Sequence, residues 1–245
     1  MDREIVRINN YYTTRDSSPS YWSSFNFFPA YMAYTQQHHL VALFKKIGIT
    51  SERNLENKKI LDVGAGSGVF SLLMYKLGAT PQNFYACELN PVRFEKLRVL
   101  SPSSNNYLGD YCSLQNSNKF DLIFLNAVLT SVVNFEVRAK IIKKCLDELE
   151  VDGSLFIFDY YKKGSPLKSD HYRALDISEV MQHTTQGDFC IKKKLRIYLN
   201  LRLGKLLSLV HLDFLIPLLT TFRILNTNVG YLVITKKSSG LKHNE

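Results

Sequence analysis

The chain has 245 residues, of which 45% are apolar and 22% are charged. These proportions are typical of a soluble globular protein and supply enough apolar material for one packed core. The net charge of +9 favours anionic partners, so nucleic acid, an anionic membrane face and a phosphorylated acceptor all stay open. None of the four cysteines forms a C-x-x-C pair, which argues against a zinc ribbon or a redox dithiol, and we expect no metal. The longest apolar stretch, residues 206–222, contains His211, Asp213 and Pro217, so no membrane-spanning helix is expected.

The N-terminal part of the chain is rich in aromatic side chains, which a disordered tail would not hold. We therefore expect residues 1–50 to form a helical arm that packs against the domain and covers a binding cleft as a lid. Apolar side chains recur at three- and four-residue spacing over residues 30–47, which predicts a helix there. Residues 51–240 form the predicted globular domain and residues 241–245 a tail. Charged residues follow Met1 instead of the apolar run of a signal peptide, so a cytoplasmic location is expected.

Short apolar runs alternate with helical patterns from residue 60 onward, which predicts an open α/β sheet, mostly parallel, with helices on both faces. The last third is expected to hold an alternating strand around residues 195–201, an amphipathic helix over 206–219 that Pro217 interrupts, and a closing strand at 230–234. The earlier strands are predicted at residues 60–63, 83–88, 107–108, 120–125 and 154–158. Helices are predicted at residues 69–77, from 91 onward and at 137–149. A turn is predicted at Asp152-Gly153, between the last of these helices and the strand at 154–158.

A glycine-rich loop, residues 64–68, directly follows the first predicted strand. Glycine lets the backbone turn tightly and lets a ligand approach closely. A dinucleotide fingerprint requires a third glycine where Val69 stands, and a phosphate-binding loop requires a Gly-Lys-Ser/Thr ending that is absent. Asp62 stands two residues before the loop. The pattern suits a ligand that carries a cationic amino group and a carboxylate but no phosphates.

Two further acids follow the next predicted strands. Glu88 ends the second strand, 20 residues after Gly68, where a carboxylate can accept hydrogen bonds from both hydroxyls of a ribose. Asp110 comes just after the third strand, where it could accept from an adenine amino group. Each acid by itself could be a solvated loop residue. Three acids at successive strand ends, together with the glycine loop, favour a nucleoside-binding site.

These motifs resemble class I S-adenosylmethionine-dependent methyltransferases. Residues 60–68 resemble the first motif, Glu88 the ribose-binding acid of the second, Gly109-Asp110 the adenine-side motif and residues 120–126 the fourth strand. The resemblance implies a Rossmann-like seven-stranded sheet with its last strand antiparallel, S-adenosylmethionine as cofactor and S-adenosylhomocysteine as product. The implied cofactor-binding residues are Asp62, Gly64, Ala65, Gly66, Gly68, Glu88, Leu89, Gly109, Asp110, Tyr111 and Asn126.

A narrower resemblance concerns methyltransferases of O-antigen and capsule polysaccharide gene clusters. It is carried by residues 127–132, 158–161, 172–179 and 228–231, although Ala174 stands where relatives tend to have glycine. It implies O-methylation of a sugar or cell-surface glycan precursor, which could be phosphorylated. The expected acceptor-binding residues are Tyr12, Tyr21, Trp22, Tyr160 and Arg173.

A hydroxyl acceptor benefits from a general base. Asp159 is the first candidate because the fifth strand delivers it to the ligand edge of the sheet, with a structural carboxylate as the alternative. His171 is the second candidate, with an ordinary surface histidine as the alternative.

Other functions stay open. The basic charge is compatible with an RNA methyltransferase, but no appended RNA-binding module fits in 245 residues, so nucleic acid is not the expected partner. A methyltransferase for another small molecule and a catalytically silent cofactor-binding regulator are further alternatives. The basic residues within 192–205 could contact phosphate or an anionic membrane surface, or simply face solvent. The apolar helix after them could be a homodimer contact, a pocket lid or a membrane-facing surface.

Overall fold

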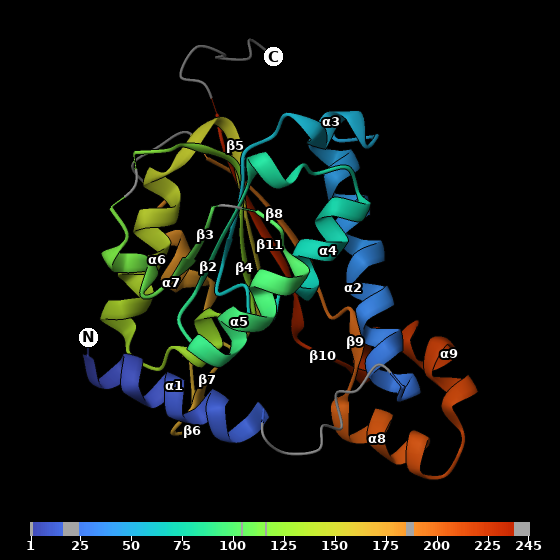
Figure 1. Cartoon of the computed structure of the whole chain (residues 1–245). Helices are drawn as coiled ribbons and strands as arrows, with labels where there is room; N and C mark the ends of the chain where they lie inside the picture. The colour runs from blue at the N-terminus through green and yellow to red at the C-terminus, as the bar shows by residue number, and fades with distance from the viewer. Residues whose placement is uncertain (1, 17–24, 104, 116, 185–188, 238–245) are drawn as a thin grey trace.

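The structure is a computed structural model, which describes residues 2–16, 25–103, 105–115, 117–184 and 189–237. Its centre is a seven-stranded sheet with the order β3-β2-β1-β4-β5-β11-β8 (Figure 1). The first five strands run parallel, and β11 is antiparallel to both of its neighbours, which confirms the predicted sheet. The strands are β1 (Ile60–Val63), β2 (Phe84–Glu88), β3 (Asn106–Leu108), β4 (Phe120–Asn126), β5 (Leu149–Tyr160), β8 (Phe189–Leu195) and β11 (Val229–Lys236).

Helices cover both faces of the sheet (Figure 1). One face carries α2 (Phe27–Lys46), α3 (Arg53–Glu56), α4 (Val69–Lys76) and α5 (Pro91–Leu100), and the other carries α6 (Phe135–Asp147) and α7 (Ile177–Met181). The central strands are therefore buried on both sides, which is why they read as continuous apolar runs.

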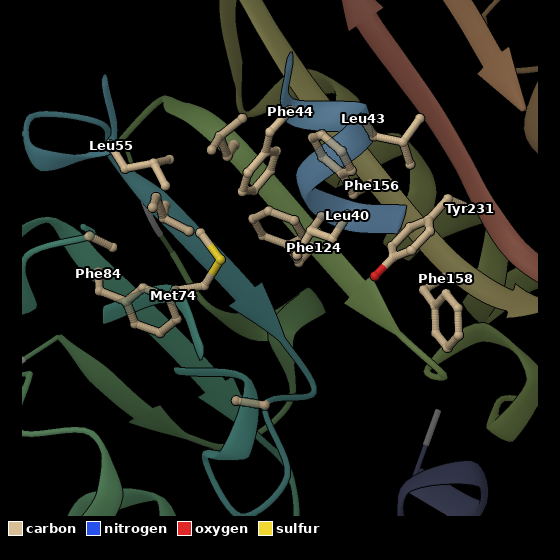
Figure 2. Packing of buried hydrophobic residues seen from close by; sticks show 14 of the residues in the cluster. Leu40, Leu43, Phe44, Leu55, Met74, Phe84, Phe124, Phe156, Phe158 and Tyr231 are labelled. Carbon is tan, nitrogen blue, oxygen red and sulfur yellow. The ribbon is translucent and has the colours of Figure 1, made fainter. Parts of the chain in front are cut away.

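The core on the α2 face is dominated by aromatic rings (Figure 2). Phe44 of α2 meets Phe156 of β5 at 5.5 Å between ring centroids, and Phe156 stacks on Phe124 of β4 at 5.0 Å. Leu40 and Leu43 are buried in the same cluster. The helix predicted at residues 30–47 thus shares one core with the sheet, while the boundary between an arm at 1–50 and a domain at 51–240 stays a prediction.

Three local predictions differ from the structure. The alternating segment at residues 195–201 is not one strand, because Arg196 has a left-handed φ of 58° that separates β8 from β9 (Tyr198–Leu199). Pro217 stands in the first turn of α9 (Ile216–Thr220), so it starts a helix instead of interrupting one. Asp152-Gly153 lies inside β5, where the pairing register with β4 shifts.

The segment between β8 and β11, residues 196–228, forms a helical insertion beside α2 (Figure 1). It contains β9, α8 (Leu201–Leu209), η4 (Asp213–Leu215), α9, η5 (Arg223–Leu225) and β10 (Asn226–Thr227). A further strand pair, β6 (Leu167–Ser169) with β7 (Tyr172–Arg173), follows β5. Three short 3-10 helices lie in the connections: η1 (Pro81–Asn83) between α4 and β2, η2 (Tyr111–Ser113) between β3 and β4, and η3 (Leu129–Ser131) between β4 and α6.

The aromatic N-terminal segment forms α1 (Asp2–Asp16), which lies below the sheet in Figure 1. The predicted tail, residues 241–245, lies outside the described residues. Among the helices that the structure describes, none is long and apolar enough to cross a membrane.

Candidate active site

A cavity of about 930 Å³ lies at the carboxyl ends of β1, β2 and β4, between the sheet and α1. This is the edge at which open α/β sheets bind their ligands. Most of the residues predicted to bind the cofactor meet here, although they come from four separate segments of the chain. Those that line the cavity are Asp62, Gly64, Ala65, Gly66, Glu88, Leu89, Gly109, Asp110, Tyr111 and Asn126.

The glycine loop is held against β2 by its own backbone. The amides of Gly64 and Ala65 both donate to the carbonyl of Cys87, at 2.8 and 3.0 Å. Gly64 and Gly66 have φ values of 71° and 59°, in the left-handed region that favours glycine. The loop therefore presents bare backbone to the cavity in one conformation.

Gly68 stands at the end of the glycine loop, and its predicted contact with the cofactor stays a prediction. It does not line the cavity but caps the start of α4, with a φ of 86°. A Cβ at this position would lie 3.2 Å from the Cα of Leu97 on α5. Gly68 therefore lets α4 and α5 pack closely, which shapes the loop without a group that faces the ligand.

The carboxylate of Glu88 is fixed by two backbone amides. One oxygen accepts a hydrogen bond from Gly66 at 2.7 Å and the other from Asn90 at 2.7 Å. The residue is only 5% exposed, and burial raises its pKa above the usual range. Because each carboxylate oxygen can accept more than one hydrogen bond, the group can still receive two hydroxyls of a ribose.

Asp62 and Asn126 form the polar floor of the cavity. Their side chains share a long hydrogen bond of 3.5 Å, and burial, assisted by the nearby charge of Glu88, raises the pKa of Asp62 to about 7. Within the described part of the chain, Asp62 Oδ2 and Asn126 Oδ1 have no hydrogen-bond partner. Two buried acceptors without a donor are costly unless a ligand satisfies them, and they suit a cationic amino group.

Asp110 and Tyr111 bound the cavity on the side of β3. Asp110 accepts hydrogen bonds from the Cys112 amide at 3.1 Å and from the Ser113 hydroxyl at 3.0 Å, so it also caps η2. The hydroxyl of buried Tyr111 donates to Glu148 at 2.6 Å. These contacts hold the η2 turn at the cavity, and a hydrogen bond from Asp110 to adenine stays a prediction.

Helix α1 lines one side of the cavity, and its C-terminal half is bound to α5. The guanidinium of Arg93 donates to both carboxylate oxygens of Asp16, at 2.7 and 2.9 Å. It also lies 3.8 Å from the ring centroid of Tyr12. Tyr12, a predicted acceptor-binding residue, lines the cavity, and its hydroxyl lies 2.6 Å from that of Ser131 in η3.

The N-terminal half of α1 is bound to the loop after β4. Glu4 accepts a hydrogen bond from the Val133 amide at 2.6 Å, and Arg7 donates to the Ser131 carbonyl at 2.6 Å. Sequence reasoning missed Glu4, Asp16 and Arg93 because each contact joins residues far apart in the chain. Neither the spacing of these residues nor the sequence around them predicts such contacts.

Neither of the predicted general bases lines the cavity. Asp159 is 2% exposed and accepts hydrogen bonds from the amide of Thr130 at 3.2 Å and from its hydroxyl. Burial raises the pKa of Asp159 to about 6. His171 lies on the outer side of α1, where its ring stacks on Tyr11 at 4.6 Å and Nδ1 is 3.3 Å from Arg7.

The other predicted acceptor-binding residues are also away from the cavity or undescribed. Arg173 places its guanidinium 4.4 Å from the centroid of the Phe135 ring, and Tyr160 lies beside Tyr172 at 6.2 Å between centroids. Tyr21 and Trp22 lie outside the described residues. Their roles, and those of Asp159 and His171, stay predictions.

Residues 32–190 match a family described as "Methyltransferase domain". The chain belongs to this family. The match covers most of the chain and confirms the predicted class of enzyme, a methyltransferase. No curated protein matches the sequence of the chain at a significant level.

Solved structures of methyltransferases share the fold at low sequence identity. Magnesium protoporphyrin IX methyltransferase from Synechocystis PCC 6803, with bound S-adenosylmethionine, has a TM-score of 0.61 and 12% identity, over 96% of this chain and 97% of its own. A methyltransferase from Methanosarcina mazei has a TM-score of 0.52 and 19% identity, over 76% and 95%. One from Clostridium acetobutylicum has a TM-score of 0.53 and 11% identity, over 84% and 92%. The predicted Rossmann-like fold is confirmed.

Family membership and the cavity agree on the methyl donor. The unpartnered acceptors of Asp62 and Asn126 suit an amino group, and the doubly anchored Glu88 suits a ribose. The glycine loop has no lysine for phosphates. S-adenosylmethionine carries the first two groups and no phosphate, so it is the cofactor of this methyltransferase.

Proposed function

We propose that this methyltransferase transfers the methyl group of S-adenosylmethionine to a hydroxyl of a sugar or a cell-surface glycan precursor. The observation that carries the proposal is the polar lining that α2 adds to the cavity. Tyr34, Gln36 and Gln37 face it from α2, and Tyr12 faces it from α1. Amide groups can donate and accept hydrogen bonds with sugar hydroxyls, and tyrosine rings offer flat faces to sugar rings.

The size of the cavity supports two ligands. Its volume of about 930 Å³ is near the upper end of small-molecule sites, which are roughly 300–1,000 Å³. The cofactor supplies an activated methyl group on a sulfonium together with its leaving group. The chain therefore has to bind the acceptor, align its hydroxyl for in-line attack and exclude water. The α1 lid, bound at both ends, serves the last of these tasks.

Asp159 fits a positioning role in this proposal. Its carboxylate holds Thr130, and the neighbouring Ser131 contacts both Tyr12 and Arg7 of the lid. The Asp159 carboxylate thus fixes η3, on which α1 rests. A direct role as general base would require the Asp159 carboxylate to leave Thr130. Either role predicts lower turnover for Asp159→Asn, and full activity of this variant would exclude both roles.

The proposal is tested by incubating the purified chain with S-adenosylmethionine and separate pools of nucleotide-linked sugars, lipid-linked glycan precursors and small amines. We expect S-adenosylhomocysteine to form with a sugar pool, whose product gains one methyl group on oxygen by mass spectrometry. Methylation of amines alone would refute the acceptor class. No turnover with any pool would favour a cofactor-binding regulator.

An RNA methyltransferase is the second candidate, and only the charge of +9 favours it. RNA binding that weakens steeply with salt, together with methylated RNA, would support it. A chain that does not bind RNA would exclude this second candidate. The proposed function is compatible with a homodimer and with a cytoplasmic location, and each of these needs a measurement of its own.

A further inference from the structure

The helical insertion, residues 196–228, holds eight of the 21 large apolar residues that are exposed in the described part of the chain. Single exposed apolar residues are normal, but a continuous group of them marks an interaction site. Leu209 is 77% exposed and Ile224 is 87% exposed. The docking face, as we call it, comprises six side chains that are each more than half exposed: Leu206, Leu209, Phe214, Leu218, Phe222 and Ile224.

The insertion already has a separate inward face that holds it to the protein. Leu207 of α8 and Ile216 of α9 are buried in one cluster with Phe28 of α2. A Cβ on Gly204 would lie 2.4 Å from the Phe28 ring, so α8 packs closely on α2. Since the inward side chains meet the packing needs of these helices, the docking face is not needed for folding.

The charges around the docking face are nearly all positive. Residues 197–227 contain Arg202, Lys205 and Arg223 but only one acid, Asp213, whose carboxylate accepts a hydrogen bond from Ser208 within the insertion. Arg202 and Arg223 are exposed.

More positive charge lies where the insertion meets α2 and β8. His39 of α2 is half-buried, and burial together with nearby Lys194 and Arg223 lowers its pKa to about 4. Lys194 of β8 and Arg223 of η5 therefore both lie near His39, and Arg223 stands in the chain between the exposed side chains of Phe222 and Ile224.

We propose that this face docks on the anionic surface of a lipid bilayer, with its apolar side chains at the acyl boundary and its cations on headgroup phosphates. Apolar and cationic groups on one face are the combination that binds such surfaces. A two-fold symmetric dimer through the same face would instead bring two positively charged patches together, because such an interface uses the same patch of both subunits. Like charges in that arrangement oppose association.

Docking would bring the cavity close to the headgroups. Phe28, which holds α8, is six residues before Tyr34, which lines the cavity, and this is about 9 Å along the helix axis. Figure 1 shows α8 and α9 beside the same half of α2. This consequence rests on the proposed function, since it makes a phosphate-bearing, lipid-linked glycan precursor the acceptor. The docking itself does not depend on any acceptor.

The test is cosedimentation of the full chain with phosphatidylcholine vesicles, with and without about one third phosphatidylglycerol. We expect binding to the anionic vesicles that is at least tenfold stronger and that falls as salt rises. The combined variant Leu209→Ser, Phe214→Ser and Ile224→Ser should lose at least tenfold of it. The matched control is Val99→Ser with Val151→Ser, which changes exposed apolar residues on α5 and β5.

Charge is tested separately from apolar contact. Arg202→Glu with Arg223→Glu should reduce binding to anionic vesicles, while Arg98→Glu on α5 should leave it unchanged. Calorimetric affinity for S-adenosylmethionine shows that every variant is folded, because these positions do not line the cavity.

Three outcomes would overturn the proposal. These are no cosedimentation by the native chain, equal binding to both kinds of vesicle, and a dimer in sedimentation equilibrium that the serine variant abolishes. Docking with no methylated glycan would leave the membrane face standing and refute the acceptor. Methylation of a soluble sugar without docking would refute the membrane face and leave the proposed methylation of a sugar standing.

Discussion

Replacing Glu88 by alanine removes the acceptor of the amides of Gly66 and Asn90 and, on the predicted assignment, the acceptor of both ribose hydroxyls. A hydrogen bond to a charged group contributes about 1.5–3 kcal/mol, so the loss of two ribose contacts costs about 3 kcal/mol of binding free energy or more. That is roughly a hundredfold increase in the Kd for S-adenosylmethionine. Calorimetry measures it directly.

The same substitution also affects the protein without ligand. The two amides lose their acceptor, and a partly hydrated, unpaired amide costs about 1 kcal/mol or more, so the free energy of unfolding should fall by about 2 kcal/mol. Glu88→Gln separates the effects, because its carbonyl can accept from only one amide while the side-chain shape stays. We expect the Kd and the free energy of unfolding of Glu88→Gln to lie between those of the alanine variant and those of the native chain. An unchanged Kd in the alanine variant would refute the ribose assignment.

Three other substitutions test the lid, the cavity floor and the η3 turn. Arg93→Ala breaks the Asp16 ion pair and the contact with Tyr12, together worth about 1–2 kcal/mol, so stopped-flow fluorescence should show cofactor release roughly tenfold faster, unlike Arg98→Ala. The pKa of Asp62 is raised to about 7, and a cationic ligand prefers the ionised form, so affinity should rise with pH from about 6 to 8, and Asp62→Asn should flatten this profile. The pKa of Asp159 is about 6 in the folded protein and 3.8 in the reference state, so its proton stabilises the fold fully below about pH 4, and that stability is lost as the pH rises through about 6. Denaturation across this range should show that the free energy of unfolding falls by about 3 kcal/mol, and Asp159→Asn should remove this fall. The variant should also have lower turnover and unchanged cofactor affinity. A pH profile of stability identical to that of the native chain would contradict the ionisation of buried Asp159.

Much of the fold could be predicted because its signals are local. Buried parallel strands read as apolar runs, and the glycine loop, Asp62 and Glu88 stand at the ends of two of them. In a parallel sheet these ends meet at one edge, so residues 26 positions apart were predicted to share one site. Val69 stands where a dinucleotide fingerprint requires a glycine, and the preceding Gly68 lets α4 pack closely on α5.

The rest depended on contacts between distant residues. Asp159 is the second-last residue of β5, and its carboxylate accepts hydrogen bonds from Thr130. No periodicity in the sequence predicts such a partner. The path of α1 follows from the pairing of Asp16 with Arg93, 77 positions away. The positions of most strands, the glycine loop and its acids were determined by the sequence itself, because short-range patterning sets them. The position of α1 at the cavity, the surroundings of Asp159 and the exposed face of the insertion were decided only by tertiary packing, which selects one among many partners that the chain offers.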